Sequence, residues 1–447
     1  MENKRERLGS RLGFILLSAG CAIGCGNVWG FPYKTGANGG GGFVLIYLIC
    51  LLLLGLPIMT MEFSLGRASQ ASPLYMLPKL KGESGKKWGF YGWIAYIGNI
   101  ALMAFYTVVA GWFFYYFFQY ILGDTVNLSY ESTKMNTGVN AGYMALVVAL
   151  GFGILSFNLQ KGLEAVTKYM MIALFLLLII LGVHSLTLPG AAEGMKFYLI
   201  PDFSKINGQV IVTAMNQSFF TLSLGIGSMA IFGSYIDKKK ALMGESAIVI
   251  SLDTFVALLA GVIIFPACFT YGQEVGAGPG LLFDTMNKVF GNMAGGRVWG
   301  ILFFLFMIFA AMSTVLAVFE NILAMTRELT GWSRRKGSII CAVVMFIIAL
   351  TSAFGFKEIN FHPFGEGTYF FDLWDFLVNT LLLPLGCVIV TIFCSFKIGW
   401  GWDGFVQEAN TGKGLKIRPW MKPIFKYVVP VVTTAILIYG LVTYSWG

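Results

Sequence analysis

AGCAIGCGNVWGFPY, residues 19–33, is a glycine-rich stretch inside an apolar segment that is long enough to cross a membrane. In hydrocarbon each unpaired backbone N–H or C=O group costs several kcal/mol, so a helix opens at this depth only where it lines a polar cavity. A second interruption, TLSLGIG at residues 221–227, lies inside another apolar segment in the second half of the chain. One discontinuous helix in each half is typical of secondary transporters.

The composition is that of an integral membrane protein. The chain has 447 residues, of which 57% are hydrophobic and 12% charged, and its mean hydropathy is +0.74. A bilayer core of about 30 Å needs roughly 20 apolar residues per helix. Eleven segments meet this length, so we expect an all-α membrane protein with eleven transmembrane helices. The segments are 11–37, 42–70, 88–122, 139–157, 164–187, 208–236, 240–271, 297–330, 337–354, 370–397 and 424–446.

Basic residues are distributed unevenly over the two faces of the membrane. If the N-terminus is cytoplasmic, the inner segments hold 24 of the 31 Lys and Arg residues and the outer segments hold seven. This positive-inside pattern predicts a multi-pass protein of the cell membrane (inner or plasma membrane), with a cytoplasmic N-terminus and an extracellular C-terminus. The net charge of +9 is therefore explained by basic residues that face one side of the lipid bilayer, and no nucleic-acid partner is expected.

The two halves of the chain match as repeats. Residues 11–187 and 208–397 each begin with an interrupted segment and contain five spans, while 424–446 is an additional helix. Because five is an odd number, the second repeat is inverted in the membrane, which brings both interruptions to one central site. We expect a single transporter domain over residues 1–447 with a 5+5 inverted repeat.

The first interruption offers groups that bind ions and charged ligands. Its N–H groups and positive dipole end attract a carboxylate, and its freed carbonyl groups attract a cation. Gly24 and Gly26 let the backbone approach a ligand closely, while Ala22 and Asn27 can present oxygen atoms to a small ion. The alternative is that these glycines only permit close helix packing. The clustering of glycines and the second interruption favour the binding role.

Hydroxyl groups supplement these oxygens. Thr221 and Ser223 belong to the second interruption, and Ser313 and Thr314 lie in the middle of the segment 297–330. Oxygen ligands suit hard cations. Such hydroxyls commonly bond to their own helix, so on their own Ser313 and Thr314 are weak indicators.

Three carboxylates stand out inside apolar segments, where each costs about 3 kcal/mol and is by default a functional hypothesis. Asp253 has no Lys or Arg near it in its own segment, so we predict a functional role. Glu62 is expected to cap freed N–H groups of an unwound helix. Glu320 has no specific predicted role.

Four stretches resemble the neurotransmitter:sodium symporter family. They are RLGFILLSAGCAIGCGNVWGFPYKTGANGGGGF from residue 11, PIMTMEFSLGR from 57, SFFTLSLGIG from 218 and FAAMSTVLAVFEN from 309. The resemblance implies an all-α fold with discontinuous helices 1 and 6. It also implies alternating access, sodium-coupled uptake of an amino acid, two Na⁺ ions and no organic cofactor.

The resemblance also implies two sodium sites. The first would use Ala22, Asn27, Thr221 and Asp253, with the substrate carboxylate as a further ligand. The second would use backbone carbonyls and two hydroxyls, from Gly20, Ile23, Ala310, Ser313 and Thr314.

For the substrate, the family pattern implies that the carboxylate meets the amides of Gly24 to Gly26 and the hydroxyl of Tyr106. The ammonium would meet carbonyls between Phe220 and Ser223, with Ala22 and Thr221 nearby. Members that carry monoamines have an Asp where this chain has Gly24, so the negative charge must come with the substrate. The implied pocket walls are apolar, which favours leucine or an aromatic amino acid. They are Leu102, Val109, Phe220, Ile226 and Val318.

Two departures from the family pattern concern chloride. Position 253 is Asp where many members have Asn, and Ala257 replaces the hydroxyl residue of chloride-dependent members. A fixed carboxylate supplies the charge that chloride otherwise brings, so we predict chloride independence, although Tyr47, Gln217 and Thr221 do match chloride-site positions.

Further departures concern the gates. Gly30 stands where the family has an Arg that faces an acid, here Asp375, so the usual outer ion pair is expected to be missing. The inner pair is expected to remain as Arg5 and Glu328. Ile172 replaces a helix-5 proline that would loosen the helix near the second sodium.

Two rival functions stay open at this stage. A non-transporting amino-acid sensor would keep the same fold and site. A proton-coupled amino-acid carrier would use Asp253 as its proton site. The sequence contains no nucleophile, metal cluster or phosphate loop that would indicate an enzyme.

Replacing the intramembrane carboxylate tests the sodium assignment. Asp253→Ala is expected to abolish uptake because it removes the negative charge from the first sodium site. Sodium-driven uptake by this variant would be measured in proteoliposomes, and a normal rate would contradict the assignment.

Overall fold

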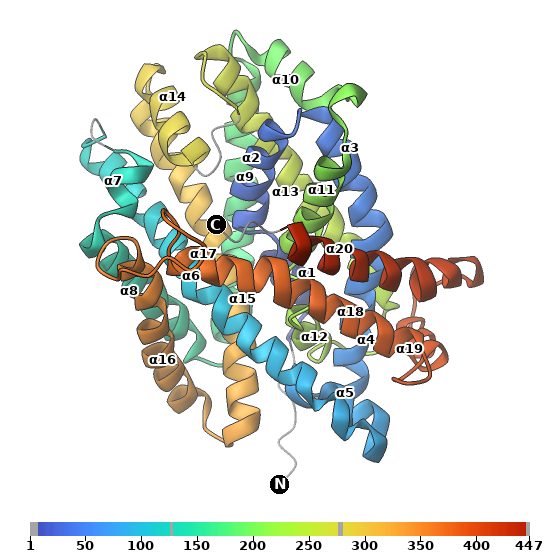
Figure 1. Cartoon of the computed structure of the whole chain (residues 1–447). Helices are drawn as coiled ribbons and strands as arrows, with labels where there is room; N and C mark the ends of the chain where they lie inside the picture. Colours follow the sequence, from blue (N-terminus) through green and yellow to red (C-terminus); the bar gives the residue numbers. More distant parts are fainter. Residues whose placement is uncertain (1–7, 126–127, 276–279, 444–447) are drawn as a thin grey trace.

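The computed structural model describes residues 8–125, 128–275 and 280–443, which fold almost entirely into helices (Figure 1). Nine helices in the described part are long and apolar enough to cross a bilayer. In chain order these spans are α3 (Gly41–Cys50) running on into α4 (Leu56–Ser69), α5 (Pro73–Lys81) with α6 (Phe90–Leu122), α8 (Thr137–Leu155), α9 (Ala165–Leu186), α13 (Leu242–Thr270), α15 (Gly296–Thr330), α16 (Arg334–Gly355), α17 (Phe370–Phe376) with α18 (Leu383–Ser395), and the span ending in α20 (Val429–Thr443).

The first break separates α1 (Arg11–Ala22) from α2 (Phe31–Ala37). Ile23 is extended and ends α1, and a π-helical turn, Gly26–Gly30, leads into α2. The two parts are bent by 49° and together are apolar enough to form a tenth span.

The second break separates α11 (Gly208–Thr221) from α12 (Ser228–Gly233). Ser223, Gly225 and Gly227 have φ angles of 50°, 99° and 72°, in the left-handed region that favours glycine. This broken pair lies within the sixth predicted segment, 208–236. The predicted all-α architecture with discontinuous first and sixth helices is therefore confirmed.

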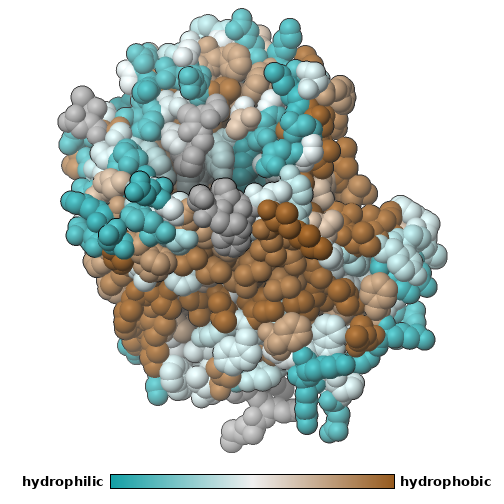
Figure 2. Space-filling model, viewed as in Figure 1, coloured by the Kyte–Doolittle hydropathy of each residue, from teal (hydrophilic) through white to brown (hydrophobic). Residues whose placement is uncertain are grey.

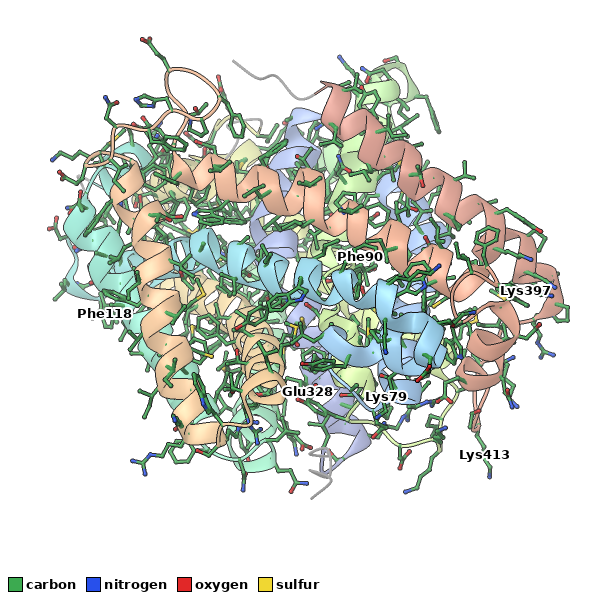
Figure 3. All side chains as sticks on the ribbon, turned by 60° about the horizontal axis from the view of Figure 1, so that its bottom comes forward. Lys79, Phe90, Phe118, Glu328, Lys397 and Lys413 are labelled. Carbon is green, nitrogen blue, oxygen red and sulfur yellow. The ribbon has the colours of Figure 1, made fainter. Side chains whose placement is uncertain are left out.

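The surface has the polarity of a membrane protein. Figure 2 shows a broad apolar band across the middle of the visible face, between more polar ends. Large exposed hydrophobic side chains come from different spans, such as Leu52, Leu176 and Ile347. Figure 3 turns the end that carries the N-terminus toward the viewer and labels Lys79, Lys413 and Glu328 there.

Short helices cover the opposite end of the molecule (Figure 1). They are α7 (Tyr130–Lys134), α10 (Ala191–Leu199) and α14 (Met286–Asn292). α10 packs tightly on α13, since a Cβ atom on Gly194 would lie 2.7 Å from the backbone of Pro266.

Glu62 of α4 caps the second break. Its fully buried carboxylate accepts hydrogen bonds from the N–H of Gly225 at 2.6 Å and from the N–H of Met229 at 3.2 Å. These amides have lost their helical partners, and in a membrane they would otherwise stay unpaired. The predicted capping role of Glu62 is confirmed.

Side chains of α6 satisfy the carbonyl groups of the same break. The Tyr91 hydroxyl donates to the carbonyl of Gly225 at 3.0 Å, and Asn99 Nδ2 donates to that of Ile226 at 2.9 Å. Helix α18 approaches from the other side, where a Cβ on Gly386 would lie 1.9 Å from the carbonyl oxygen of Gly225. The break is thus held by three different spans.

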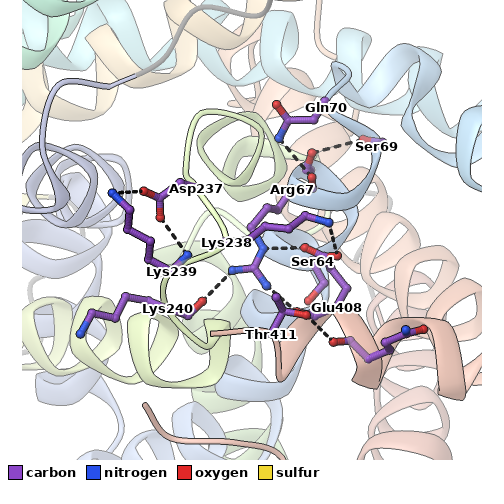
Figure 4. A network of polar contacts seen from close by, with 12 residues as sticks. Ser64, Arg67, Ser69, Gln70, Asp237, Lys238, Lys239, Lys240, Glu408 and Thr411 are labelled. Atoms are coloured by element: carbon purple, nitrogen blue, oxygen red, sulfur yellow. Dashed lines mark hydrogen bonds and ion pairs between the residues drawn. The ribbon is translucent and has the colours of Figure 1, made fainter. Parts of the chain in front are cut away.

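A buried polar network joins three segments that are far apart in the sequence (Figure 4). Arg67, at the end of α4, is fully buried and donates to Glu408 Oε1 at 2.6 Å, to the carbonyl of Lys240 at 2.6 Å and to the carbonyl of Glu408. Lys238 pairs with the other oxygen of Glu408 at 3.1 Å. Glu408 belongs to α19 (Trp402–Ala409), so this network ties the connection before the last span to α4 and to the segment before α13.

Glu320 also has a structural role that the sequence did not indicate. Its carboxylate pairs with the buried guanidinium of Arg334 and accepts a hydrogen bond from the Tyr235 hydroxyl at 3.0 Å. This contact fixes α16 against α15, because Arg334 is the first residue of α16.

Removing the Glu62 carboxylate should destabilise the fold. Glu62→Ala leaves two buried amides unpaired, at about 1–3 kcal/mol each, and Glu62→Gln should cost less because one acceptor oxygen remains. Thermal unfolding in detergent would measure this, with exposed Glu83→Ala as the control. Equal melting temperatures for Glu62→Ala and the wild type would contradict the capping role.

Candidate functional site

A first group of oxygen atoms surrounds Asp253, which is fully buried in α13. Asn27 Nδ2, in the first break, donates to Asp253 Oδ1 at 2.8 Å, and the Thr221 hydroxyl lies 3.4 Å from both carboxylate oxygens. Asn27 Oδ1 accepts from the N–H of Gly24 at 3.0 Å, close to the end of α1 at Ala22. The four residues predicted for the first ion thus lie where the two breaks meet α13.

A second group of oxygen atoms joins the end of α1 to the middle of α15. The Ser313 hydroxyl lies 3.1 Å from the carbonyl oxygen of Ile23 and 2.9 Å from that of Ala310. The Thr314 hydroxyl lies 3.3 Å from the carbonyl oxygen of Gly20 and 3.2 Å from that of Ile23. The five predicted ligands of the second ion are therefore brought together.

The spacing of this second group suits a cation. Hard cations bind protein oxygen atoms at about 2.4 Å. In an octahedral shell, neighbouring ligand oxygens are then about 3.4 Å apart. The distances between the hydroxyl and carbonyl oxygens, 2.9 to 3.3 Å, approach this value. An ion could enter with small shifts, provided that the hydroxyl protons turn away.

A small cavity of about 10 Å³ lies between the breaks. Its lining residues are Ala22, Gly24, Gly26, Leu102, Tyr106, Phe220, Ser223, Thr314 and Leu383. The N–H of Cys25 donates to the Tyr106 hydroxyl at 2.8 Å, so this tyrosine already occupies a backbone donor of the break. The cavity has room for about one water molecule, and a larger ligand requires Tyr106 or Phe220 to move.

Gly24 leaves no room for a side chain. A Cβ atom there would lie 2.3 Å from the Thr314 hydroxyl oxygen and 2.4 Å from that of Tyr106. The protein therefore cannot place a carboxylate of its own at this position without rearrangement.

The predicted pocket walls are only partly assembled around this cavity. Leu102 and Phe220 line it, Val109 lines a larger cavity beyond it, and Ile226 and Val318 are fully buried without lining either cavity. The structure adds Leu383 of α18 to the lining. No sequence signal marked Leu383, because it is one apolar residue among many in its span.

The larger cavity, here called the vestibule, has a volume of about 430 Å³. It lies between α2, α6, α7, α11 and α17, and Phe220 and Tyr106 line both cavities. Phe220 is half-buried, as expected for a residue between the small cavity and a wider one. Four charged residues line the vestibule, namely Lys34, Lys134, Asp372 and Asp375.

The positions that match a chloride site are close to the first oxygen group. Gln217 donates from Nε2 to the carbonyl of Gly26 at 2.6 Å, and Ala257 is fully buried. The Tyr47 hydroxyl is buried and finds no hydrogen-bond partner among the described residues.

The predicted gating residues lie at opposite ends. Asp375 lines the vestibule and accepts from Asn379 Nδ2 at 2.6 Å. Glu328, near the end of α15, accepts from the N–H of Ser72 at 2.8 Å. Arg5, the predicted partner of Glu328, lies outside the described residues.

Comparison with known proteins identifies close relatives. The model of the sodium:neurotransmitter symporter family matches residues 5–141 and 125–446. The chain is 34% identical to a sodium-dependent transporter of Bacillus subtilis, YhdH, with 89% of each chain covered. It is 32% identical to a sodium-dependent transporter of Haemophilus influenzae, with 98% of each covered. It is 27% identical to the bovine sodium- and chloride-dependent taurine transporter, covering 99% of this chain and 79% of that protein.

A solved structure has the same fold. The crystal structure of MhsT in complex with L-phenylalanine matches with a TM-score of 0.87 and 34% sequence identity, covering 98% of this chain and 100% of that one. The predicted 5+5 inverted-repeat fold is confirmed by this likeness, while the repeat boundaries stay a prediction.

Removing the two hydroxyls of the second oxygen group should weaken sodium binding. Ser313→Ala with Thr314→Val keeps the bulk but removes two ligands, so the sodium concentration needed for stabilisation should rise by about tenfold to hundredfold. Sodium-dependent thermal shifts would measure this, with exposed Ser251→Ala in α13 as the control. Unchanged sodium dependence would exclude the group as an ion site.

Proposed function

The chain belongs to the sodium:neurotransmitter symporter family, and we propose that this sodium-dependent transporter takes up a hydrophobic L-amino acid together with two Na⁺ ions. The observation that carries the proposal is the pair of oxygen groups next to the small cavity, which Ala22 of the first group and Thr314 of the second both line. Both groups draw on the first break, so ion binding and ligand binding share the same backbone.

The charge of the site favours a substrate that brings its own carboxylate. Gly24 has no room for an acidic side chain, while the adjacent backbone N–H groups suit an anion. A substrate carboxylate between Gly26 and the first oxygen group would complete the shell of the first ion. Sodium and substrate would then raise each other's affinity, which is reciprocal coupling.

The apolar lining supports a hydrophobic substrate side chain. Leu102, Phe220 and Leu383 surround the small cavity, and Val109 lies just beyond it. MhsT, which shares the fold, was crystallised with L-phenylalanine. Leucine and aromatic amino acids are therefore the first substrates to examine.

Chloride independence is proposed from the first oxygen group. Asp253 already supplies a fixed negative charge, and Ala257 provides no hydroxyl for an anion. An anion beside the buried Asp253 carboxylate would be repelled by it.

The orientation follows from the basic residues. The segments on the N-terminal side carry 24 of the 31 Lys and Arg residues, so this side is proposed to face the cytoplasm. The vestibule would then open to the outside, and Phe220 would separate it from the small cavity. The C-terminus would be extracellular, in a multi-pass protein of the cell membrane.

Uptake in proteoliposomes tests the proposal. Radiolabelled leucine and phenylalanine should accumulate only with a sodium gradient, and replacing chloride by gluconate should leave the rate unchanged. Asp253→Asn with Ala257→Ser should make any remaining transport depend on chloride, because the fixed charge is lost and a hydroxyl is restored.

Each alternative has a different outcome. Saturable, sodium-dependent binding without accumulation would indicate an amino-acid sensor. Accumulation that follows a proton gradient in potassium buffer would indicate a proton-coupled carrier. Accumulation that stops in gluconate would overturn chloride independence alone.

A further inference from the structure

Lys34 is a charged side chain in the wall of the vestibule, one helical turn after Gly30 in α2. Its ammonium donates to Gln217 Oε1 at 2.7 Å. The same nitrogen lies 5.8 Å from the centre of the Phe220 ring and 5.8 Å from that of Tyr33, within the range of cation–π attraction. Lys34 thus touches the residue that separates the vestibule from the small cavity.

Asp375 of α17 lines the same vestibule and carries the opposite charge to Lys34. Both residues are described, and no direct ion pair joins them in this conformation. Opposite charges lining one half-enclosed cavity attract more strongly than charges in bulk water. Movement of α17 toward α2 would narrow the vestibule and bring the two side chains closer together.

The other lysine of the vestibule is already engaged. Lys134 pairs with Glu131 at 2.9 Å, and its ammonium lies over the rings of Tyr369 and Phe356 at 5.3 and 5.9 Å. Among the basic residues that line the described vestibule, Lys34 is therefore the one placed to respond to Asp375.

A hydrogen-bond chain connects Lys34 to the substrate site. Lys34 donates to Gln217 Oε1, and the Nε2 of Gln217 donates to the carbonyl of Gly26 at 2.6 Å. Gly26 lines the small cavity. A ligand that shifts this backbone would also shift Gln217 and hence the lysine.

We propose that Lys34 is the positioning residue that closes the vestibule, by pairing with Asp375 once a ligand occupies the small cavity and sodium the oxygen groups beside it. In this arrangement Gly30 needs no basic side chain, because Lys34 supplies the cation one turn further along α2. The usual Arg–Asp pair stays missing, as expected from Gly30, and Lys34 supplies a different cation for Asp375. The inference rests on the proposed amino-acid site.

A cysteine placed in the vestibule wall can report closure. Thr213 of α11 lines the vestibule, and the native Cys25 is buried beside the amides assigned to the substrate. The series would therefore carry Thr213→Cys with Cys25→Ala. Reaction of the new cysteine with a membrane-impermeant methanethiosulfonate reagent would be followed in potassium, in sodium, and in sodium with phenylalanine, with Cys25→Ala alone as the blank. In the parent of this series, called the wild type below, sodium with phenylalanine should slow the labelling. Lys34→Gln should lose this protection by about fivefold or more and release bound phenylalanine correspondingly faster.

Rescue variants separate closure from general damage. Lys34→Arg should keep the protection, and so should the swap of Lys34→Asp with Asp375→Lys. Gly30→Arg should partly restore it in the Lys34→Gln background, because a Cβ at Gly30 meets Gln217 and Cys25 only at 3.4–3.6 Å. Lys134→Gln is the matched control from the same cavity and should behave like the wild type.

The two proposals fail in different ways. If the wild type is protected by phenylalanine and Lys34→Gln is protected equally, the closing role of Lys34 is overturned while the amino-acid site stands. If neither leucine nor phenylalanine slows cysteine labelling or accumulates in the wild type, the substrate assignment and the inference built on it are both contradicted.

Discussion

Backbone hydrogen bonding in the absence of water is the constraint on which this structure depends. A membrane helix can be interrupted only if other groups pair its freed amides and carbonyls. Glu62 accepts hydrogen bonds from the amides of the second break, and Tyr91 and Asn99 donate hydrogen bonds to its carbonyls. These side chains come from α4 and α6, so the opening of one helix requires the packing of two others.

The same freed groups build the candidate site. Carbonyl oxygens of Gly20 and Ile23 are available because α1 ends there, and α15 completes the set with Ser313 and Thr314. In an unbroken helix these carbonyls would be bonded along the chain. On the proposed assignment, ion binding would be a direct consequence of the interruption, since the cation would take over oxygens that no longer accept hydrogen bonds within the helix.

Charged residues are few inside the membrane-spanning region, and two of the buried ones have clear partners. Arg67 is enclosed by Glu408 and backbone carbonyls, and Glu320 by Arg334, so these groups stabilise the contacts between segments. Asp253 is different, because its described partners are the neutral side chains of Asn27 and Thr221. A buried carboxylate without a cationic side-chain partner is one that a metal ion can neutralise.

The sequence by itself determined the spans, both interruptions and the oxygen-bearing residues, because hydropathy, glycine clustering and intramembrane charge are local properties of the chain. The role of Glu62 also followed, since an unwound helix needs a buried acceptor. Only the tertiary structure decided what converges from distant segments. Leu383 carries no local signal and enters the small cavity through packing of α18 on the second break. Lys34 carried a signal, a charge in an apolar segment, but its contacts with Gln217 and Phe220 arise only when α2 and α11 pack together.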